Sequence, residues 1–480
     1  MPFDEFIGTE CMTARFETLG NASLLVFNDE KPILATDPWL TGTCYFGSWA
    51  LDHPLSAQQI QHIIKADWTW ISHGHPDHLH DESLNMMPAG KKFLLPDHYD
   101  SDISTNLRDR GFDVTILPYR SWYTLTPEIR VMCIDNINQD AILVVEADGS
   151  LIIDLNDSPL CGEFNFLRRL VRNYPREKTY LLALCSVDAD MFNFVGESGE
   201  SLVGPAEERK PGAIWTVART AAQLGVGSFC CSSSQHIYVR ADSVWANPHR
   251  IGWADMKRHW SRPEVNLIEP FVTVDLATGE YIRNHPEQIS DETQITTATA
   301  DDNWSDRLTA AEWEQVEAFM HRFQLIRRHV DFVEFQVGGE TRRIPINNRG
   351  GTPNARGIVF QVPRQSLLTT VEYGYLDDLL IGNFMKVRLI NTRLYPRFTP
   401  LVAKIGGNAK VYTRRQYYRF LLRYFSRNPI GMITYRAQIE WDQIVLPWFR
   451  ALSERLGIKR PLKYLYRRWL GDPVGTGKPV

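Results

Sequence analysis

The segment from Ile71 to His80 carries the residues best suited to chemistry in this chain. It runs Ile-Ser-His-Gly-His-Pro-Asp-His-Leu-His, so four of the 13 histidines fall within ten residues. His73 and His75 can direct their imidazoles at one ion, and Asp77 and His78 can direct their side chains at a second position nearby. Imidazole combined with carboxylate suits Zn, Fe, Mn or Ni and does not suit Ca or Mg. The segment therefore predicts a site for one or two transition-metal ions.

An exposed histidine-rich loop, or a helix N-terminus capped by Asp77, is the alternative interpretation of this segment. The residues before it favour the metal site. Trp68-Thr-Trp-Ile-Ser72 has the composition of a short buried strand, and it leads directly into the histidines. Two pairs of ligand residues in a turn after a strand are the structural context that a metal motif requires.

The order Ser72-His-Gly-His-Pro-Asp-His78 resembles the HxHxDH signature of the metallo-β-lactamase superfamily. Three further segments resemble its CMP-N-acetylneuraminate hydroxylase-like branch: Asp37–Gly42, Leu151–Asp157 and Asp377–Gly382. The resemblance is strong over residues 13–250 and diffuse beyond. It implies an α/β fold, an αββα sandwich with a one- or two-metal site between its sheets.

Carried over residue by residue, the ligand pattern of the superfamily matches at four positions: His73, His75, Asp77 and His78. Asp157 stands where the bridging carboxylate belongs, just past a predicted strand, and Asp154 is the competing choice. The resemblance implies a last histidine after the strand Gly227–Cys231, and His236 is the candidate, slightly later than the usual pattern. The third histidine is missing. Its expected turn, Asp135–Asp140, offers only carboxylate and amide groups.

The absence of the third histidine changes which metal and which reaction the ligand set favours. Zinc hydrolases use a first site held by histidines alone to make hydroxide near neutral pH. Two histidines and a carboxylate are instead the set that holds Fe(II) with open positions for O₂ and substrate. The sequence and the resemblance together predict a non-haem iron oxygenase, a monooxygenase-type oxidoreductase with two iron ions that acts on a polar or carrier-linked small molecule.

The proposed oxygenase would need a source of electrons, and the same ligand residues also fit other functions. The sialic-acid hydroxylase takes electrons from a Rieske cluster, which needs a Cys-x-His … Cys-x-x-His pattern. This sequence has none, so a separate ferredoxin or reductase is expected. The alternative is a dinuclear zinc hydrolase of a phosphoester, lactone or amide, with Asp77 as the catalytic residue that orients water. A third class is a scaffold with a degenerate metal site.

Short predicted strands and recurring helices must position these residues. Two strands flanking Asn28–Lys31 predict a hairpin, and a helix is predicted from its cap Ser56 to Ala66. The other predicted elements are strands at 68–72, 92–95, 114–117, 130–134, 141–146, 151–154 and 180–185 and a helix at 164–174. Because strands outnumber helices, the pattern favours a sandwich over a regular doubly wound sheet.

The chain is long enough for two domains. Its 480 residues and 55.2 kDa exceed what one compact core usually accommodates. Asn284–Asp306, rich in Thr, Asp and Asn, is a predicted linker. The predicted division is a metal-binding domain over residues 1–290 and a C-terminal α+β domain over 307–480, with one helix near Leu367–Leu380.

The C-terminal end, from Tyr412, is predicted to be helical and is strongly basic. The favoured interpretation is that these helices pair with the acidic N-terminal domain. A nucleotide, a coenzyme-A-type phosphate or an acidic carrier protein are the alternatives.

Charge, hydropathy and cysteine usage narrow the class of protein. A net charge of −5 argues against a nucleic-acid partner. No apolar run approaches the length of a membrane span, and the first residues lack the apolar core of a secretory signal. Seven scattered cysteines without CxxC spacing predict reduced thiols and a cytoplasmic location.

Overall fold

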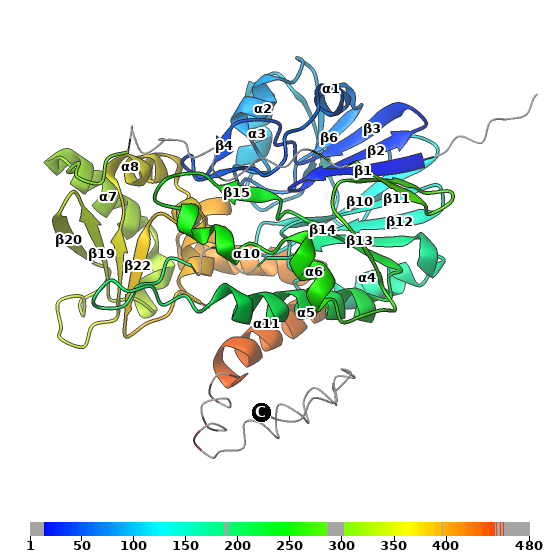
Figure 1. Cartoon of the computed structure of the whole chain (residues 1–480). Helices are drawn as coiled ribbons and strands as arrows, with labels where there is room; N and C mark the ends of the chain where they lie inside the picture. Colours follow the sequence, from blue (N-terminus) through cyan, green and yellow to red (C-terminus); the bar gives the residue numbers. More distant parts are fainter. Residues whose placement is uncertain are drawn as a thin grey trace, which may run out of the picture.

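The computed structural model describes residues 14–186, 189, 192–284, 286, 302–395, 397–446, 448, 452 and 455. Two large sheets form the first part of the chain (Figure 1). One has eight strands in the order β18-β17-β1-β2-β3-β6-β7-β8. In chain order these are β1 (Ala14–Gly20), β2 (Ser23–Asn28), β3 (Lys31–Thr36), β6 (Trp68–Trp70), β7 (Lys92–Pro96), β8 (Asp113–Leu117), β17 (Val272–Asp275) and β18 (Tyr281–Arg283).

The second sheet has seven strands in the order β16-β14-β13-β12-β11-β10-β9. They are β9 (Trp122–Thr124), β10 (Ile129–Asp135), β11 (Ala141–Ala147), β12 (Ser150–Asp154), β13 (Thr179–Leu184), β14 (Ser228–Ser232) and β16 (Asn266–Ile268). The four strands from β12 to β16 in this sheet pair in parallel.

The two sheets pack face to face because apolar side chains alternate along their strands. In β11, Leu143 and Val145 share a buried cluster with Phe16 of the first sheet, whereas Ile142 and Val144 belong to the cluster on the outer face. Helices cover both outer faces. They are α1 (Ala57–Lys65), α2 (Asp81–Asn85) and α3 (Asp102–Asp109) on the first sheet, and α4 (Phe164–Val171), α5 (Ala206–Leu224) and α6 (Trp253–His259) on the second. The predicted αββα sandwich is confirmed.

Smaller sheets complete the described part. A three-stranded sheet contains β4 (Thr43–Cys44), β5 (Trp49–Leu51) and β15 (His236–Tyr238). In the C-terminal part, β19 (Phe332–Val337), β20 (Glu340–Pro345), β21 (Gly357–Gln361) and β22 (Lys386–Ile390) form a sheet that shares a core with α7 (Ala310–Arg322), α8 (Arg364–Tyr373) and α9 (Asp377–Ile381). The division into two domains stays a prediction, because residues 287–301 lie outside the described residues.

The single helix predicted near Leu367–Leu380 is wrong. The chain forms α8 and α9 instead, because Gly374 adopts a left-handed φ of +90° and ends α8. A new helix then starts at Asp377.

The basic helices that follow are α10 (Arg414–Arg427) and α11 (Pro429–Glu440). Arg423 and Arg427 of α10 pair with Asp97, and Arg427 also pairs with Asp135. Two arginines of these helices therefore pair with acidic residues of the N-terminal part, as the favoured interpretation expects. Residues 456–480 lie outside the described residues. Among the described helices, none combines the length and apolar character needed to cross a membrane.

Candidate metal centre

The histidine-rich loop begins where β6 ends, at the edge of the first sheet formed by the carboxyl ends of its parallel strands. β6 lies between β3 and β7 and is parallel to both. Because parallel strands end at the same edge of a sheet, the residues after β3 lie beside this loop. His73 and Asp77 are 1% exposed and His78 is fully buried. The loop is therefore part of the interior and not the exposed histidine-rich loop of the alternative interpretation.

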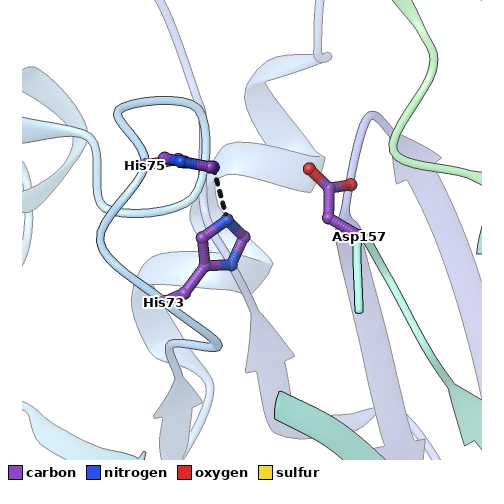
Figure 2. A group of neighbouring side chains, drawn as sticks. All are labelled: His73, His75 and Asp157. Atoms are coloured by element: carbon purple, nitrogen blue, oxygen red, sulfur yellow. Dashed lines mark hydrogen bonds between the residues drawn. The ribbon is translucent and has the colours of Figure 1, made fainter. Parts of the chain in front are cut away.

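His73 and His75 face each other at the centre of the candidate site (Figure 2). His73 Nε2 lies 2.8 Å from His75 Nδ1. Asp157, which follows β12 in the second sheet, directs its carboxylate toward this pair from the opposite side. One possible ligand atom from each of the three residues lies within 4.8 Å of the others. The sandwich thus brings together groups from both of its sheets.

Asp77, His78 and Asp157 form a second group of the same kind. His78 Nε2 lies 3.4 Å from Asp77 Oδ2 and 3.3 Å from Asp157 Oδ2. Asp157 is thus common to the two groups, and its role as a bridging ligand stays a prediction. Asp154 belongs to no such group among the described residues; it is fully buried and accepts a hydrogen bond from the Asn156 backbone N–H at 3.0 Å.

Asp37 and Ser72 hold the outward nitrogens of two of these histidines. Asp37 Oδ2 lies 2.9 Å from His78 Nδ1, and Asp37 accepts hydrogen bonds from the backbone N–H and the hydroxyl of Ser72, both at 2.7 Å. The Ser72 hydroxyl lies 2.9 Å from His73 Nδ1. Both rings therefore turn their Nε2 atoms toward the centre, the arrangement found around histidine metal ligands.

Asp77 is held as a carboxylate. It accepts hydrogen bonds from the Tyr45 hydroxyl at 2.6 Å and from Asn21 Nδ2 at 2.9 Å. Burial alone raises the pKa of Asp77, but the charge and hydrogen bond of His78 and the hydrogen bond from Tyr45 outweigh burial, so this pKa is lowered. Asp77 is therefore ionised at neutral pH.

Sequence reasoning missed two carboxylates that come from the C-terminal part. Asp377 Oδ2 lies 3.0 Å from His75 Nε2, and Asp377, Asp378 and His75 form a third group of potential ligand atoms. The segment Asp377–Gly382 resembled the hydroxylase-like branch, but nothing in its local pattern indicated a site. The contact joins residues 302 positions apart and exists only in the folded chain.

The turn that lacks the third histidine offers one carboxylate near the centre. Asp135 pairs with Arg427. Asp140 is 2% exposed and has its Oδ1 atom 3.9 Å from Lys404 Nζ. Burial raises the pKa of Asp140, and the charges of Lys404 and His75 act in the opposite direction. The charge of His75 thus acts on the pKa of the Asp140 carboxyl.

His236 belongs to none of the three groups of potential ligands. Its ring stacks on Trp49 with centroids 3.5 Å apart and an interplanar angle of 4°. Neither ring nitrogen has a hydrogen-bond partner among the described residues, and burial lowers the pKa of His236 to about 3. The charge of Asp77 acts on this pKa, so the two side chains share an electrostatic environment. A role for His236 as a ligand stays a prediction.

The metal-free protein is expected to lose stability as the pH rises from about 6.5 to about 8. Burial raises the pKa of Asp154 and of Asp378 to about 8. Burial lowers the pKa of His78, but the charges of Asp77 and Asp157 outweigh it and raise that pKa. Each group binds its proton more tightly in the folded protein, so its contribution to stability is lost as the pH passes through its folded-state pKa.

Metal should change this dependence, because ligands bind metal in their deprotonated form. Buried histidines whose pKa is lowered, such as His98, oppose the trend only below about pH 6.5, where the unfolded chain gains protons. Thermal melting at the two ends of this pH range, with a chelator and with added metal, measures both slopes. Equal slopes in the two conditions would show that these groups do not surround a metal.

Comparison with known proteins gives partial likeness. No family model matches the chain. Over 130 residues, 25% of this chain, it is 28% identical to inactive cytidine monophosphate-N-acetylneuraminic acid hydroxylase of Homo sapiens and to the hydroxylase of Danio rerio. The matched segment is 26% and 22% of those proteins, so the chain spans about a quarter of the curated relatives it matches.

Solved structures are similar at low identity. A metallo hydrolase from Ignicoccus hospitalis is 17% identical with a TM-score of 0.36, covering 55% of this chain and 98% of that one. A diiron β-hydroxylase from Streptomyces venezuelae is 11% identical with a TM-score of 0.36, covering 57% and 54%. From its HxHxDH loop, its two-sheet sandwich and the partial matches to the two hydroxylases, the N-terminal part of this chain resembles the metallo-β-lactamase superfamily and, within it, the CMP-N-acetylneuraminate hydroxylase-like branch.

Proposed function

We propose that this chain is a metal-dependent oxygenase, a hydroxylase that uses non-haem iron. His73 and His75 would hold one iron together with a carboxylate, and Asp77 and His78 the other. Asp157 would bridge the two, and His236 is the further ligand implied by the resemblance. The observation that carries the proposal is the shared position of Asp157 between two groups of potential ligands.

The residues present fit metal ions. His78 Nε2, Asp157 Oδ1 and Asp140 Oδ1 are buried atoms without a hydrogen-bond partner among the described residues. An unpaired buried polar atom is costly, and a bound cation would satisfy such atoms.

The donor set favours iron over zinc. Three histidines and several carboxylates surround the centre, and the described ligand group that contains His73 and His75 has a carboxylate, Asp157, as its third member. Harder oxygen ligands suit iron better than another imidazole does. When bound, iron would supply activation of O₂. The chain's own residues would fix the ligand rings through Asp37 and Ser72 and keep the sandwich interior closed to bulk water.

A dinuclear zinc hydrolase of a phosphoester, lactone or amide is the second candidate. It is favoured by Asp77, because a carboxylate held ionised by Tyr45 and Asn21 can accept a proton from water or orient it. In this case the same groups would hold zinc.

We propose further that a polar or carrier-linked small molecule is the substrate, and that a separate ferredoxin or reductase supplies electrons because the sequence contains no Rieske pattern. The six described cysteines are buried and unpaired, which supports a reducing, cytoplasmic location.

The experiment that tests the function compares two metals in one protein. Metal-free protein is loaded with Fe(II) or with Zn(II), and oxygen uptake with a ferredoxin and its reductase is measured beside hydrolysis of generic esters. Oxygen uptake by the iron form alone supports the oxygenase. Ester hydrolysis by the zinc form, with the iron form inert to oxygen and reductant, would favour the hydrolase.

A further inference from the structure

We infer that Asp377 is the positioning residue of His75, so that the C-terminal part completes the metal centre. This inference rests on the proposed function. His75 directs Nδ1 at His73, 2.8 Å away, and Nε2 at Asp377, 3.0 Å away. One ring nitrogen thus faces the centre while the other is held by a carboxylate.

The same arrangement occurs at the other two histidines, where Asp37 holds His78 and Ser72 lies beside His73. An oxygen on the outer nitrogen fixes the ring orientation and the tautomer of a metal-binding histidine. His75 is 5% exposed and Asp377 is 3% exposed, so bulk water competes little for this contact. Asp377 therefore does for His75 what Asp37 does for His78.

Contacts with the first part of the chain fix the helix that carries Asp377. Ser48 donates a hydrogen bond to the carbonyl of Gly382, and Asn193 donates one to the carbonyl of Leu380. Asn383 donates a third, to the Tyr238 hydroxyl at 3.0 Å. With α9 held in this way, the carboxylate is placed before metal arrives, and detachment of the C-terminal part would release His75.

The test measures metal affinity, with Co(II) as a spectroscopic probe and a competing chelator. Asp377→Ala is expected to weaken the tightest Co(II) site about 10- to 100-fold and to change its visible spectrum. Asp377→Asn keeps an acceptor oxygen and should fall between wild type and Asp377→Ala. Asp378→Asn, in the same group of potential ligand atoms, separates positioning from direct binding of an ion. Glu372→Gln, an exposed carboxylate of α8, is the control and should bind like wild type.

Two results would overturn the inference. Wild-type affinity in folded Asp377→Ala would remove the positioning role. An equal loss in Asp378→Asn would mean that both carboxylates bind an ion directly together with His75 Nε2. Wild-type protein that takes up no Co(II) would instead refute the proposed function, and this inference with it. Melting curves of the metal-free variants show whether each one is folded.

A separate surface carries an independent inference. Exposed apolar side chains recur at intervals of one or two helical turns along α11 and the helical residues after it: Ile430, Ile433, Trp441, Val445, Trp448 and Leu452. α11 extends away from the sandwich (Figure 1). On α10, Tyr418 and Leu422 are exposed beside the exposed Arg415 and Arg419. The exposed side of α10 and α11 thus contains both apolar and basic side chains.

We propose that this face binds an anionic membrane surface. From Tyr412 onward the sequence has fourteen Lys and Arg against four Asp and Glu, although the whole chain has a net charge of −5. Like charge opposes the packing of a second copy against this face. Tryptophan and aliphatic side chains next to arginines suit the boundary between anionic headgroups and acyl chains.

Sedimentation of the full chain with vesicles tests this proposal. Binding is expected to vesicles of phosphatidylcholine with phosphatidylserine, to fall with added salt, and to be absent with phosphatidylcholine alone. The double variant Ile433→Asp, Trp441→Asp should bind the phosphatidylserine vesicles at least about tenfold more weakly than wild type. Ile282→Asp, at a still more exposed position on β18, should bind like wild type. The proposal would be overturned if the protein bound neither kind of vesicle. A concentration-dependent dimer that the double variant abolishes would overturn it as well.

Discussion

Replacing His73 and His75 together by alanine is expected to remove the first metal and abolish turnover while the sandwich stays folded. The two rings supply both imidazoles of one ligand group. Loss of an outer partner alone typically costs about 10- to 100-fold in metal affinity, and removal of two ligands should cost more. Both residues lie in the loop beyond β6, so no strand pairing depends on them. Elemental analysis, oxygen uptake and thermal melting measure the three effects.

The matched control is His80→Ala, in the same loop. His80 belongs to no group of potential ligands among the described residues, and its ring accepts a hydrogen bond from the Ser83 backbone at the start of α2. Its loss should cost about 1 kcal/mol of stability, as other helix caps do, and leave metal content unchanged. A double variant that keeps its full metal content would locate the site elsewhere.

Asp157→Asn is expected to lower occupancy at both metal positions. Asp157 is the residue common to the two ligand groups that contain His73 and His78, so the loss of its charge affects both. Asp154→Asn is the comparison. Burial raises the pKa of Asp154 to about 8, so this group is largely protonated at neutral pH and a neutral amide replaces it with little change. Metal stoichiometry and melting temperature of the two variants decide which aspartate bridges.

If only the Asp154 variant loses metal, the assignment of the bridging carboxylate is wrong. Loss in both variants would indicate that Asp154 stays ionised beside the metal and that the two aspartates act together.

Local patterns in the sequence favoured a sandwich, and the resemblance carried by the HxHxDH order implied its αββα form. The continuous apolar run at the start of Ala141–Ala147 gives β11 two buried faces, and the Ser56 cap gives α1 its start. The HxHxDH order was likewise readable, because its spacing and its strand lie within ten residues of one another. These features depend on neighbours in the sequence.

The features that the sequence did not predict depend on distant packing. Asp377 reaches His75 only because Gly374 ends α8 and the C-terminal part packs against the sandwich. His236 follows the predicted strand, but Trp49 stacks on its ring. Neither contact leaves a trace in local composition or periodicity, since each joins residues more than one hundred positions apart.

Elemental analysis of the protein purified from its native host, together with its optical spectrum, distinguishes the iron oxygenase from the zinc hydrolase. We expect bound iron with visible charge-transfer absorption, lost together with the metal in the double variant of His73 and His75. Zinc at both positions, with a featureless visible spectrum and no oxygen uptake after iron loading, would contradict it.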